Sequence, residues 1–377
     1  MELHIVRRGE TLRAIGARYG LAAAHLAEMN ELADPARLAV GAAMVIAGDD
    51  DAPRRTIEVC GGALAPNAPG GAEIAPYLTF YTPPGARITA SGELDAADED
   101  AAMARAAERA NAAALLTVSN LGAHGGYSGD IAHAVFTDEG VQSRVFENTL
   151  STLREKKHRG VNFDFQYVHP FDRGAYSAFV RRAGELLHPA GYFLMSTLAP
   201  TEPGRRNALL TAGQDYAVHG EVMDRVAVMM YDWGYSLGAP QAVSPADKVR
   251  AALDVAVAAI GRGKLLMGLS CGGYNWAVPW RQGEAAAPIS AATAVNLAAS
   301  AGCEIHYDSV AAAPYFNYTD AAGVRRELWF EDARSWRARL ALAEEYGLAG
   351  IYLRPYERPY RPAWELFSSM FDVEKII

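Results

Sequence analysis

The segment Gly160-Val161-Asn162-Phe163-Asp164-Phe165-Gln166-Tyr167 decides the fold, because it places a polar side chain at every second position of an apolar run. Successive side chains of a β-strand point to opposite faces, so Asn162, Asp164 and Gln166 share one face. Polar groups on an inner strand face cost free energy unless they have partners. The pattern predicts a ligand site at the end of this strand. The alternative is a buried polar network that holds the strand against its neighbours.

Seven other short β-rich runs accompany this strand, and long alanine-rich helical stretches separate them. Alternation of this kind predicts β-α units and a mainly parallel sheet. Eight units predict an α/β fold, the (β/α)8 TIM barrel, whose chemistry lies at the carboxyl ends of its strands. An inserted hairpin between Ile305 and Phe330 would form one wall of a cleft. The expected strands are Ile57–Cys60, Tyr77–Tyr81, Ala114–Ser119, Val161–Phe165, Tyr192–Thr197, Arg225–Tyr231, Leu265–Leu269 and Gly350–Leu353.

The first 48 residues form a separate unit. A strand-like alternation at Leu3–Val6 precedes Thr11, which is placed to cap a helix that Gly20 ends. A second helix and a closing strand over 43–46 complete a βααβ pattern. The turn-rich residues 49–55 read as a linker, so we expect a small domain over 1–48 and the barrel over 56–377.

Charge and composition exclude several functions. The formal net charge is −9, which argues against a nucleic-acid partner and against a basic membrane anchor. No apolar run is long enough for a membrane span, and the N-terminus lacks the apolar core of a signal peptide, so we expect synthesis in the cytoplasm. No phosphate-binding loop and no His/Cys ligand cluster is present, so we expect no metal and no cofactor.

The N-terminal unit resembles a LysM domain. Residues 4–20 read HIVRRGETLRAIGARYG, Met29-Asn30 follows, and residues 34–46 read DPARLAVGAAMVI. The resemblance implies binding of N-acetylglucosamine units of peptidoglycan or chitin in a shallow groove between two loops. The alternative is that Thr11 is only a helix cap and Asp34-Pro35 only a turn. The implied groove residues are Gly9, Glu10, Thr11, Leu12, Asn30, Leu32, Asp34 and Pro35.

The barrel resembles glycoside hydrolase family 18, and most closely its spore-associated branch, the spore cortex-lytic N-acetylglucosaminidases. The strand motif of that family is D-x-x-D-x-D-x-E, and its G-V-N-x-D-F-E form matches 160–166 except at the last position. Met229-Met230-Tyr231-Asp232 also agrees. The resemblance implies substrate-assisted hydrolysis, in which Asp164 orients the acetamido group and Tyr231 bonds its oxygen. It further implies substrate contacts from Asn162, Met229, Asp232, Trp233 and Arg354.

Gln166 occupies the position of the catalytic acid. An amide cannot protonate a leaving group, so a general acid contribution on the order of 10²–10⁴-fold should be lost. An engineered Glu→Gln change and a natural loss of catalysis both explain Gln166. Arg354 stands where the family usually has a tryptophan platform, and this second departure favours the natural loss. Asp232 and Glu357 are the nearest carboxyl groups that could replace the missing acid.

Three functions follow from these features. The first is a glycan-binding pseudoenzyme whose LysM domain and barrel both hold peptidoglycan or chitin. The second is an active peptidoglycan N-acetylglucosaminidase, and the third is a structural protein of a spore layer. The resemblance implies deposition in the spore coat or cortex.

Overall fold

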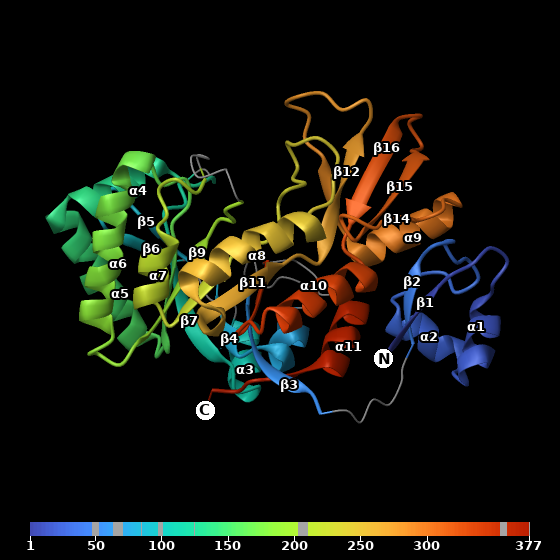
Figure 1. Cartoon of the computed structure of the whole chain (residues 1–377), viewed down its shortest axis with the longest axis horizontal. Helices are drawn as coiled ribbons and strands as arrows, with labels where there is room; N and C mark the ends of the chain where they lie inside the picture. The colour runs from blue at the N-terminus through green and yellow to red at the C-terminus, as the bar shows by residue number, and fades with distance from the viewer. Residues whose placement is uncertain are drawn as a thin grey trace.

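A closed barrel of eight parallel strands forms the centre of the computed structural model (Figure 1). Each strand pairs in parallel with the next, and the last, β17, pairs again with the first, β3. The predicted (β/α)8 TIM barrel is therefore confirmed. The strands are β3 (Arg55–Gly61), β4 (Phe80–Tyr81), β7 (Ala113–Ser119), β8 (Gly160–Asp164), β9 (Phe193–Leu198), β10 (Arg225–Val228), β11 (Leu265–Leu269) and β17 (Gly350–Leu353).

The structure describes residues 1–46, 53–62, 71–83, 85–96, 101–123, 125–202, 210–354 and 360–376. Most of the expected linker over 49–55 lies outside these ranges, and β3 begins at Arg55. Glu357 also lies outside them.

Helices cover the outside of the barrel. Phe163 of β8 and Phe165 just after it pack against them: both are fully buried and contact Phe179 of α6 at ring-centroid distances of 5.3 and 5.5 Å. The polar residues of this strand therefore point inward, as the alternation predicts. The helices are α3 (Ala101–Arg109), α4 (Gly129–Thr137), α5 (Glu139–Glu155), α6 (Arg173–Leu187), α7 (Tyr216–Val222), α8 (Ala246–Ile260), α10 (Ala333–Glu345) and α11 (Arg361–Met370). Short elements complete this layer: β5 (Ala86–Ile88), β6 (Leu94–Ala96), β18 (Phe371–Val373) and the 3₁₀ helices Gly71–Tyr77, Pro170–Asp172 and Arg262–Lys264.

The insertion is larger than the predicted hairpin. It forms a five-stranded antiparallel sheet in the order β13-β12-β16-β15-β14, with helix α9 (Ala291–Ala301) beside it. Its strands are β12 (Gly272–Ala277), β13 (Ala287–Ser290), β14 (His306–Asp308), β15 (Ala313–Thr319) and β16 (Arg325–Phe330). The prediction missed β12 and β13, because β12 pairs with β16, which lies about fifty residues later in the chain.

Two barrel strands are shorter than predicted. The first part of the expected strand at Tyr77–Tyr81 is the end of a 3₁₀ helix that contains Pro76, which has no N–H for a sheet ladder. The expected strand at Arg225–Tyr231 ends at Val228, where the amide of Met230 turns back to bond the carbonyl of Val228 at 2.8 Å.

The N-terminal unit has the expected βααβ order. It consists of β1 (Glu2–Ile5), α1 (Leu12–Tyr19), α2 (Ala23–Met29) and β2 (Ala43–Ile46), and its two strands pair antiparallel. Thr11 caps α1 by accepting a hydrogen bond from the amide of Ala14 at 3.2 Å, and Gly20 ends the helix with φ +71°.

Candidate active site

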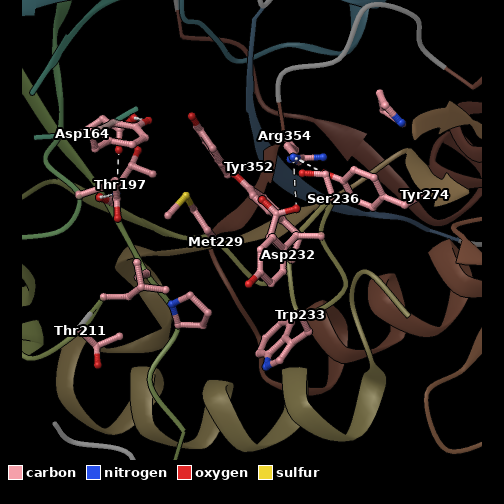
Figure 2. Close-up of a pocket in the computed structure, with 18 of the residues that line it drawn as sticks. Asp164, Thr197, Thr211, Met229, Asp232, Trp233, Ser236, Tyr274, Tyr352 and Arg354 are labelled. Atoms are coloured by element: carbon pink, nitrogen blue, oxygen red, sulfur yellow. Dashed lines mark hydrogen bonds and ion pairs between the residues drawn. The ribbon is translucent and has the colours of Figure 1, made fainter. Parts of the chain in front are cut away.

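A pocket of about 1230 Å³ lies at the carboxyl ends of the barrel strands, with the insertion forming one wall. Residues at or just beyond the ends of β8, β9, β10 and β17 contribute polar side chains, and β12, β13 and α9 contribute the wall. Figure 2 shows these side chains converging on one space. The lining includes Tyr127, Asp164, Gln166, Tyr167, Thr197, Glu202, Met229, Tyr231, Asp232, Trp233, Tyr235, Ser236, Tyr274, Ser290, Thr293, Tyr352 and Arg354.

The Asp164 carboxylate has a hydrogen-bond donor on each oxygen. Tyr127 donates its hydroxyl to Oδ2 at 2.6 Å, and Gln166 donates its amide Nε2 to Oδ1 at 2.7 Å. Burial raises the pKa of the Asp164 carboxyl above its usual range, while the hydrogen bonds from Tyr127 and Gln166 oppose this shift. The two donors fix the direction in which this carboxylate faces the pocket.

Gln166 is 2 % exposed and its amide nitrogen has two acceptors. Besides Asp164, Nε2 donates to the carbonyl of Thr197 at 2.9 Å. The backbone of Gln166 is held by Asn120, whose amide side chain accepts from the Gln166 N–H at 3.0 Å and donates to its carbonyl at 2.8 Å. Residue 166 is thus fixed at both its backbone and its side chain.

Asn162 lies below the pocket and does not line it. Its side chain is fully buried, and its Oδ1 accepts a hydrogen bond from the hydroxyl of Thr197 at 3.0 Å. Asn162 is absent from the pocket lining, and its expected contact with substrate stays a prediction. It supports Thr197 from inside the barrel, which is the polar-network role considered as the alternative.

Arg354 joins three elements at the opposite side of the pocket (Figure 2). Its guanidinium lies 3.2 Å from Asp232 on the segment after β10, donates to the hydroxyl of Tyr274 on β12 at 3.0 Å, and lies 5.6 Å from the ring centroid of Tyr231. Burial raises the pKa of Asp232, and the Arg354 charge opposes that shift. Burial also raises the pKa of the Tyr231 hydroxyl well above its ordinary value, so Tyr231 stays a hydrogen-bond donor.

The aromatic residues after β10 and β11 divide into two groups. Trp233, Tyr235 and Tyr274 line the pocket, and the indole N–H of Trp233 donates to Glu202 at 2.6 Å. Trp276 is fully buried and bonds the carbonyl of Gly238 at 2.7 Å, so it is part of the packed core.

The expected LysM groove has an ordered acidic residue on its first side. Glu10 accepts hydrogen bonds from the amide of Arg7 at 2.9 Å and from His4 at 2.8 Å, and it pairs with Arg18 at 3.0 Å. The hydrogen bond from the Arg7 amide, followed by that from His4, lowers the pKa of Glu10 to about 2. Gly9, Thr11, Asp34 and Pro35 are exposed, and Leu32 is half-buried.

Two expected groove residues, Asn30 and Leu12, have buried side chains. Asn30 is 4 % exposed, and its amide accepts from the N–H of Val45 at 2.7 Å and donates to the carbonyls of Val45 and Leu26, each at 3.0 Å. Leu12 is buried in the hydrophobic core. Both side chains hold the domain together, and their expected contact with a glycan stays a prediction.

Among the described residues, no group of three His, Cys, Asp or Glu side chains could hold a metal ion, and no helix is long and apolar enough to cross a membrane.

Comparison with known protein families matches residues 95–353 to glycosyl hydrolases family 18 and residues 4–47 to the LysM domain. The chain belongs to glycosyl hydrolase family 18.

Several known proteins are similar to this chain over most or all of its length. The cortical fragment-lytic enzyme of Bacillus subtilis (strain 168) is 33 % identical over an alignment that covers 100 % of this chain and 99 % of the relative. The crystal structure of the Bacillus cereus spore cortex-lytic enzyme SleL is 29 % identical, has a TM-score of 0.91 and covers 99 % of this chain and 98 % of that chain. A chitinase from Chromobacterium violaceum is 26 % identical, with a TM-score of 0.76 and coverage of 83 % and 99 %. Family 18 membership and the LysM match support a function in glycan binding or hydrolysis.

The family 18 pocket contains residues that the sequence alone did not single out. Thr197 and Tyr352 lie at or near the ends of correctly predicted strands, so inward alternation on those strands could have found them. Tyr127 and Glu202 lie on loops after β7 and β9, where no periodic pattern indicates which side chain turns inward. Of the expected residues, Asp164, Gln166, Met229, Tyr231, Asp232, Trp233 and Arg354 line the pocket together.

Proposed function

We propose that this protein binds N-acetylglucosamine-containing glycan, of peptidoglycan in a spore cortex or coat or of chitin, and that its barrel has little or no glycosidase activity. The observation that carries this proposal is the position of the Gln166 amide. It lies 2.7 Å from the carboxylate of Asp164 in the pocket, where the family resemblance expects the acid.

The surroundings of residue 166 suit an amide better than a carboxyl group. Nε2 has two hydrogens and faces two acceptors, Asp164 Oδ1 and the Thr197 carbonyl. A protonated carboxyl group at the same place would have one proton to share between these two acceptors. An ionised carboxylate would face the same two oxygens without any proton to donate. The amide therefore satisfies this buried site and supplies no proton to a leaving group.

The rest of the pocket supports binding. Asp164 presents an oriented carboxylate acceptor, Tyr231 remains a neutral hydroxyl donor, and Trp233, Tyr235 and Tyr274 offer aromatic faces. An acetamido group has one N–H and one carbonyl, which match an acceptor and a donor. Sugar rings have apolar faces that stack on aromatic side chains.

An active N-acetylglucosaminidase is the second candidate, because two other carboxyl groups, Glu202 and Asp232, also line the pocket. Each has a bound partner: Glu202 accepts from Trp233, and Asp232 pairs with Arg354. This candidate therefore requires one of these contacts to open during turnover. A purely structural spore-layer protein is the third, and it requires no glycan binding at all.

Thermal unfolding in the presence of chito-oligosaccharides or peptidoglycan fragments tests the proposal. A ligand that binds only the folded state raises the unfolding temperature by mass action. We expect a shift for the parent chain and for Asp130→Asn, whose side chain is 96 % exposed outside the pocket. The matched change Asp164→Asn should reduce the shift to the part that the LysM groove contributes. No shift for the parent would reject glycan binding at this pocket.

Release of reducing sugar, assayed in parallel, separates the first two candidates. The proposal predicts background turnover in the parent. Turnover that is lost in Glu202→Gln or Asp232→Asn would instead establish the active enzyme.

A further inference from the structure

The LysM domain is bonded directly to the helix that forms the cleft wall. Asn296 of α9 receives a hydrogen bond on its Oδ1 from the amide of Ala33 at 2.8 Å, and its Nδ2 donates to the carbonyl of Glu31 at 2.9 Å. One side chain thus brackets the loop after α2. This loop also carries Asp34 and Pro35, which belong to the expected LysM groove.

A second contact between the two domains involves the next loop of the LysM domain, which precedes β2. The amide of Ile305, between α9 and β14, donates to the carbonyl of Val40 at 2.8 Å. Next to it, Gly41 has φ +84°, and a Cβ at that position would lie 1.9 Å from the carbonyl oxygen of Ile305. The two backbones therefore approach so closely that only glycine fits.

Apolar contacts extend the interface. Strand β2 of the LysM domain contacts α10 and α11 of the barrel, and Ile46 and Trp364 belong to one continuous buried cluster. An exposed ion pair, Glu28 with Arg361 at 3.1 Å, lies at its edge. Figure 1 shows the domain seated below α9 and beside α11. A buried apolar interface of this kind favours one fixed arrangement.

Helix α9 connects this interface to the cleft. Its N-cap Ser290 and Thr293 of its first turn both line the pocket. Asn296 follows three residues after Thr293, on a neighbouring part of the helix surface. The expected groove residues Gly9, Thr11, Asp34 and Pro35 remain exposed. Docking therefore leaves the LysM groove open while it fixes its position relative to the pocket.

We propose that the LysM domain is a fixed extension of the cleft wall, so that groove and cleft bind one polysaccharide strand at a set spacing. This inference rests on the proposed function of both surfaces. Two weak sites held at a fixed spacing bind a ligand that reaches both much more tightly than either site alone, and a ligand too short to reach both gains nothing. Affinity for N-acetylglucosamine oligomers should consequently rise in a step at one oligomer length.

Isothermal titration of the full chain with a series of N-acetylglucosamine oligomers of increasing length tests this proposal. The double variant Asn296→Ala/Arg361→Ala removes the bracket and the ion pair. Asn317→Ala, on the exposed face of β15, is the matched control. We expect the control to keep the step. The double variant should bind the shortest oligomers like the parent and lose at least about tenfold in affinity for those beyond the step.

Gly41→Ala serves as a second, independent way to separate the domains, since its Cβ clashes with Ile305. Calorimetric unfolding shows whether the variants still fold, and separation should split one transition into two. A variant that shows two transitions yet keeps the step would overturn the fixed spacing. A parent that binds oligomers of every length equally would overturn it as well, whereas a parent that binds none would instead reject the proposed function.

Discussion

Under the proposed function, residue 166 is the position at which the exchange of one amide group for a carboxyl group would separate binding from catalysis. Gln166→Glu replaces an amide nitrogen by oxygen at almost no change in volume. Because the new carboxyl would be buried beside Asp164 and the Thr197 carbonyl, its pKa should be raised, and it should hold a proton at mildly acid pH. We expect turnover of chito-oligosaccharides to increase on the order of 10²-fold or more, and to fall as pH rises. Initial rates from pH 4 to 8 measure this.

Gln166→Met is the control for that experiment, since it keeps the length of the side chain without a proton to give. A glutamate variant no faster than the methionine variant would mean that the acid is not the only missing element of the site.

Arg354 is the second residue whose replacement should change both the stability and the activity of the pocket. The family resemblance expects a tryptophan platform at this position, so Arg354→Trp should raise turnover once an acid is restored at residue 166. The Arg354 guanidinium, however, also pairs with Asp232 and donates a hydrogen bond to Tyr274. Arg354→Trp should therefore lower the free energy of unfolding by about 1–2 kcal/mol, less than for a fully buried pair because solvent reaches both side chains. Urea unfolding measures the loss.

The double change Arg354→Trp/Asp232→Asn should recover part of this stability, because no unpaired carboxylate remains. In a Gln166→Glu background, the tryptophan should raise turnover beyond the single glutamate variant if both groups act on one transition state. If the stability losses of Arg354→Trp and Asp232→Asn simply added in the double variant, the ion-pair explanation would be contradicted.

At the scale of elements, the sequence predicted what depends on local periodicity. Alternation identified the inward face of β8, and β11 and β17 were predicted with their observed bounds. The same local alternation did not predict β12 or β13. Strand β12 pairs with β16, which is distant in sequence, and β13 pairs with β12, so both strands depend on contacts that form only in the folded insertion. Loop residues such as Tyr127 and Glu202 were missed for the same reason: their direction is set by tertiary contacts.

The LysM groove also shows that a sequence pattern does not reveal which side chains are buried. A sequence pattern locates the loop after α2 but does not separate its buried residues from its exposed ones. Asn30→Ala should leave the N–H and carbonyl of Val45 without their partner and destabilise the domain by about 1–3 kcal/mol, whereas Asp34→Ala, at an exposed position, should not. Hydrogen exchange at the Val45 amide reports the difference. Equal protection in both variants would refute the structural role of Asn30.

At the scale of the whole molecule, one histidine couples barrel stability to pH. His219 of α7 is 1 % exposed, lies 2.9 Å from the hydroxyl of Ser196 on β9 and contacts the ring of Tyr176 on α6. It therefore connects two helices to the barrel wall. Burial lowers the pKa of its imidazole to about 3, so the folded chain keeps it neutral.

The pH dependence follows from the difference between the folded and unfolded states. The unfolded chain binds a proton at His219 below its ordinary pKa of 6.5, whereas the folded chain does not bind it until about pH 3. Between these values the unfolded state holds more protons, so stability from this group is complete above pH 6.5 and is lost as pH falls. The slope is at most about 1.4 kcal/mol per pH unit for one group. His219→Gln should flatten the dependence of the unfolding free energy on pH between 6.5 and 4, although it also lowers stability at pH 8 through lost packing. The exposed His306→Gln on β14 should change neither quantity, and a His219→Gln slope equal to that of the parent would show that other groups govern acid unfolding.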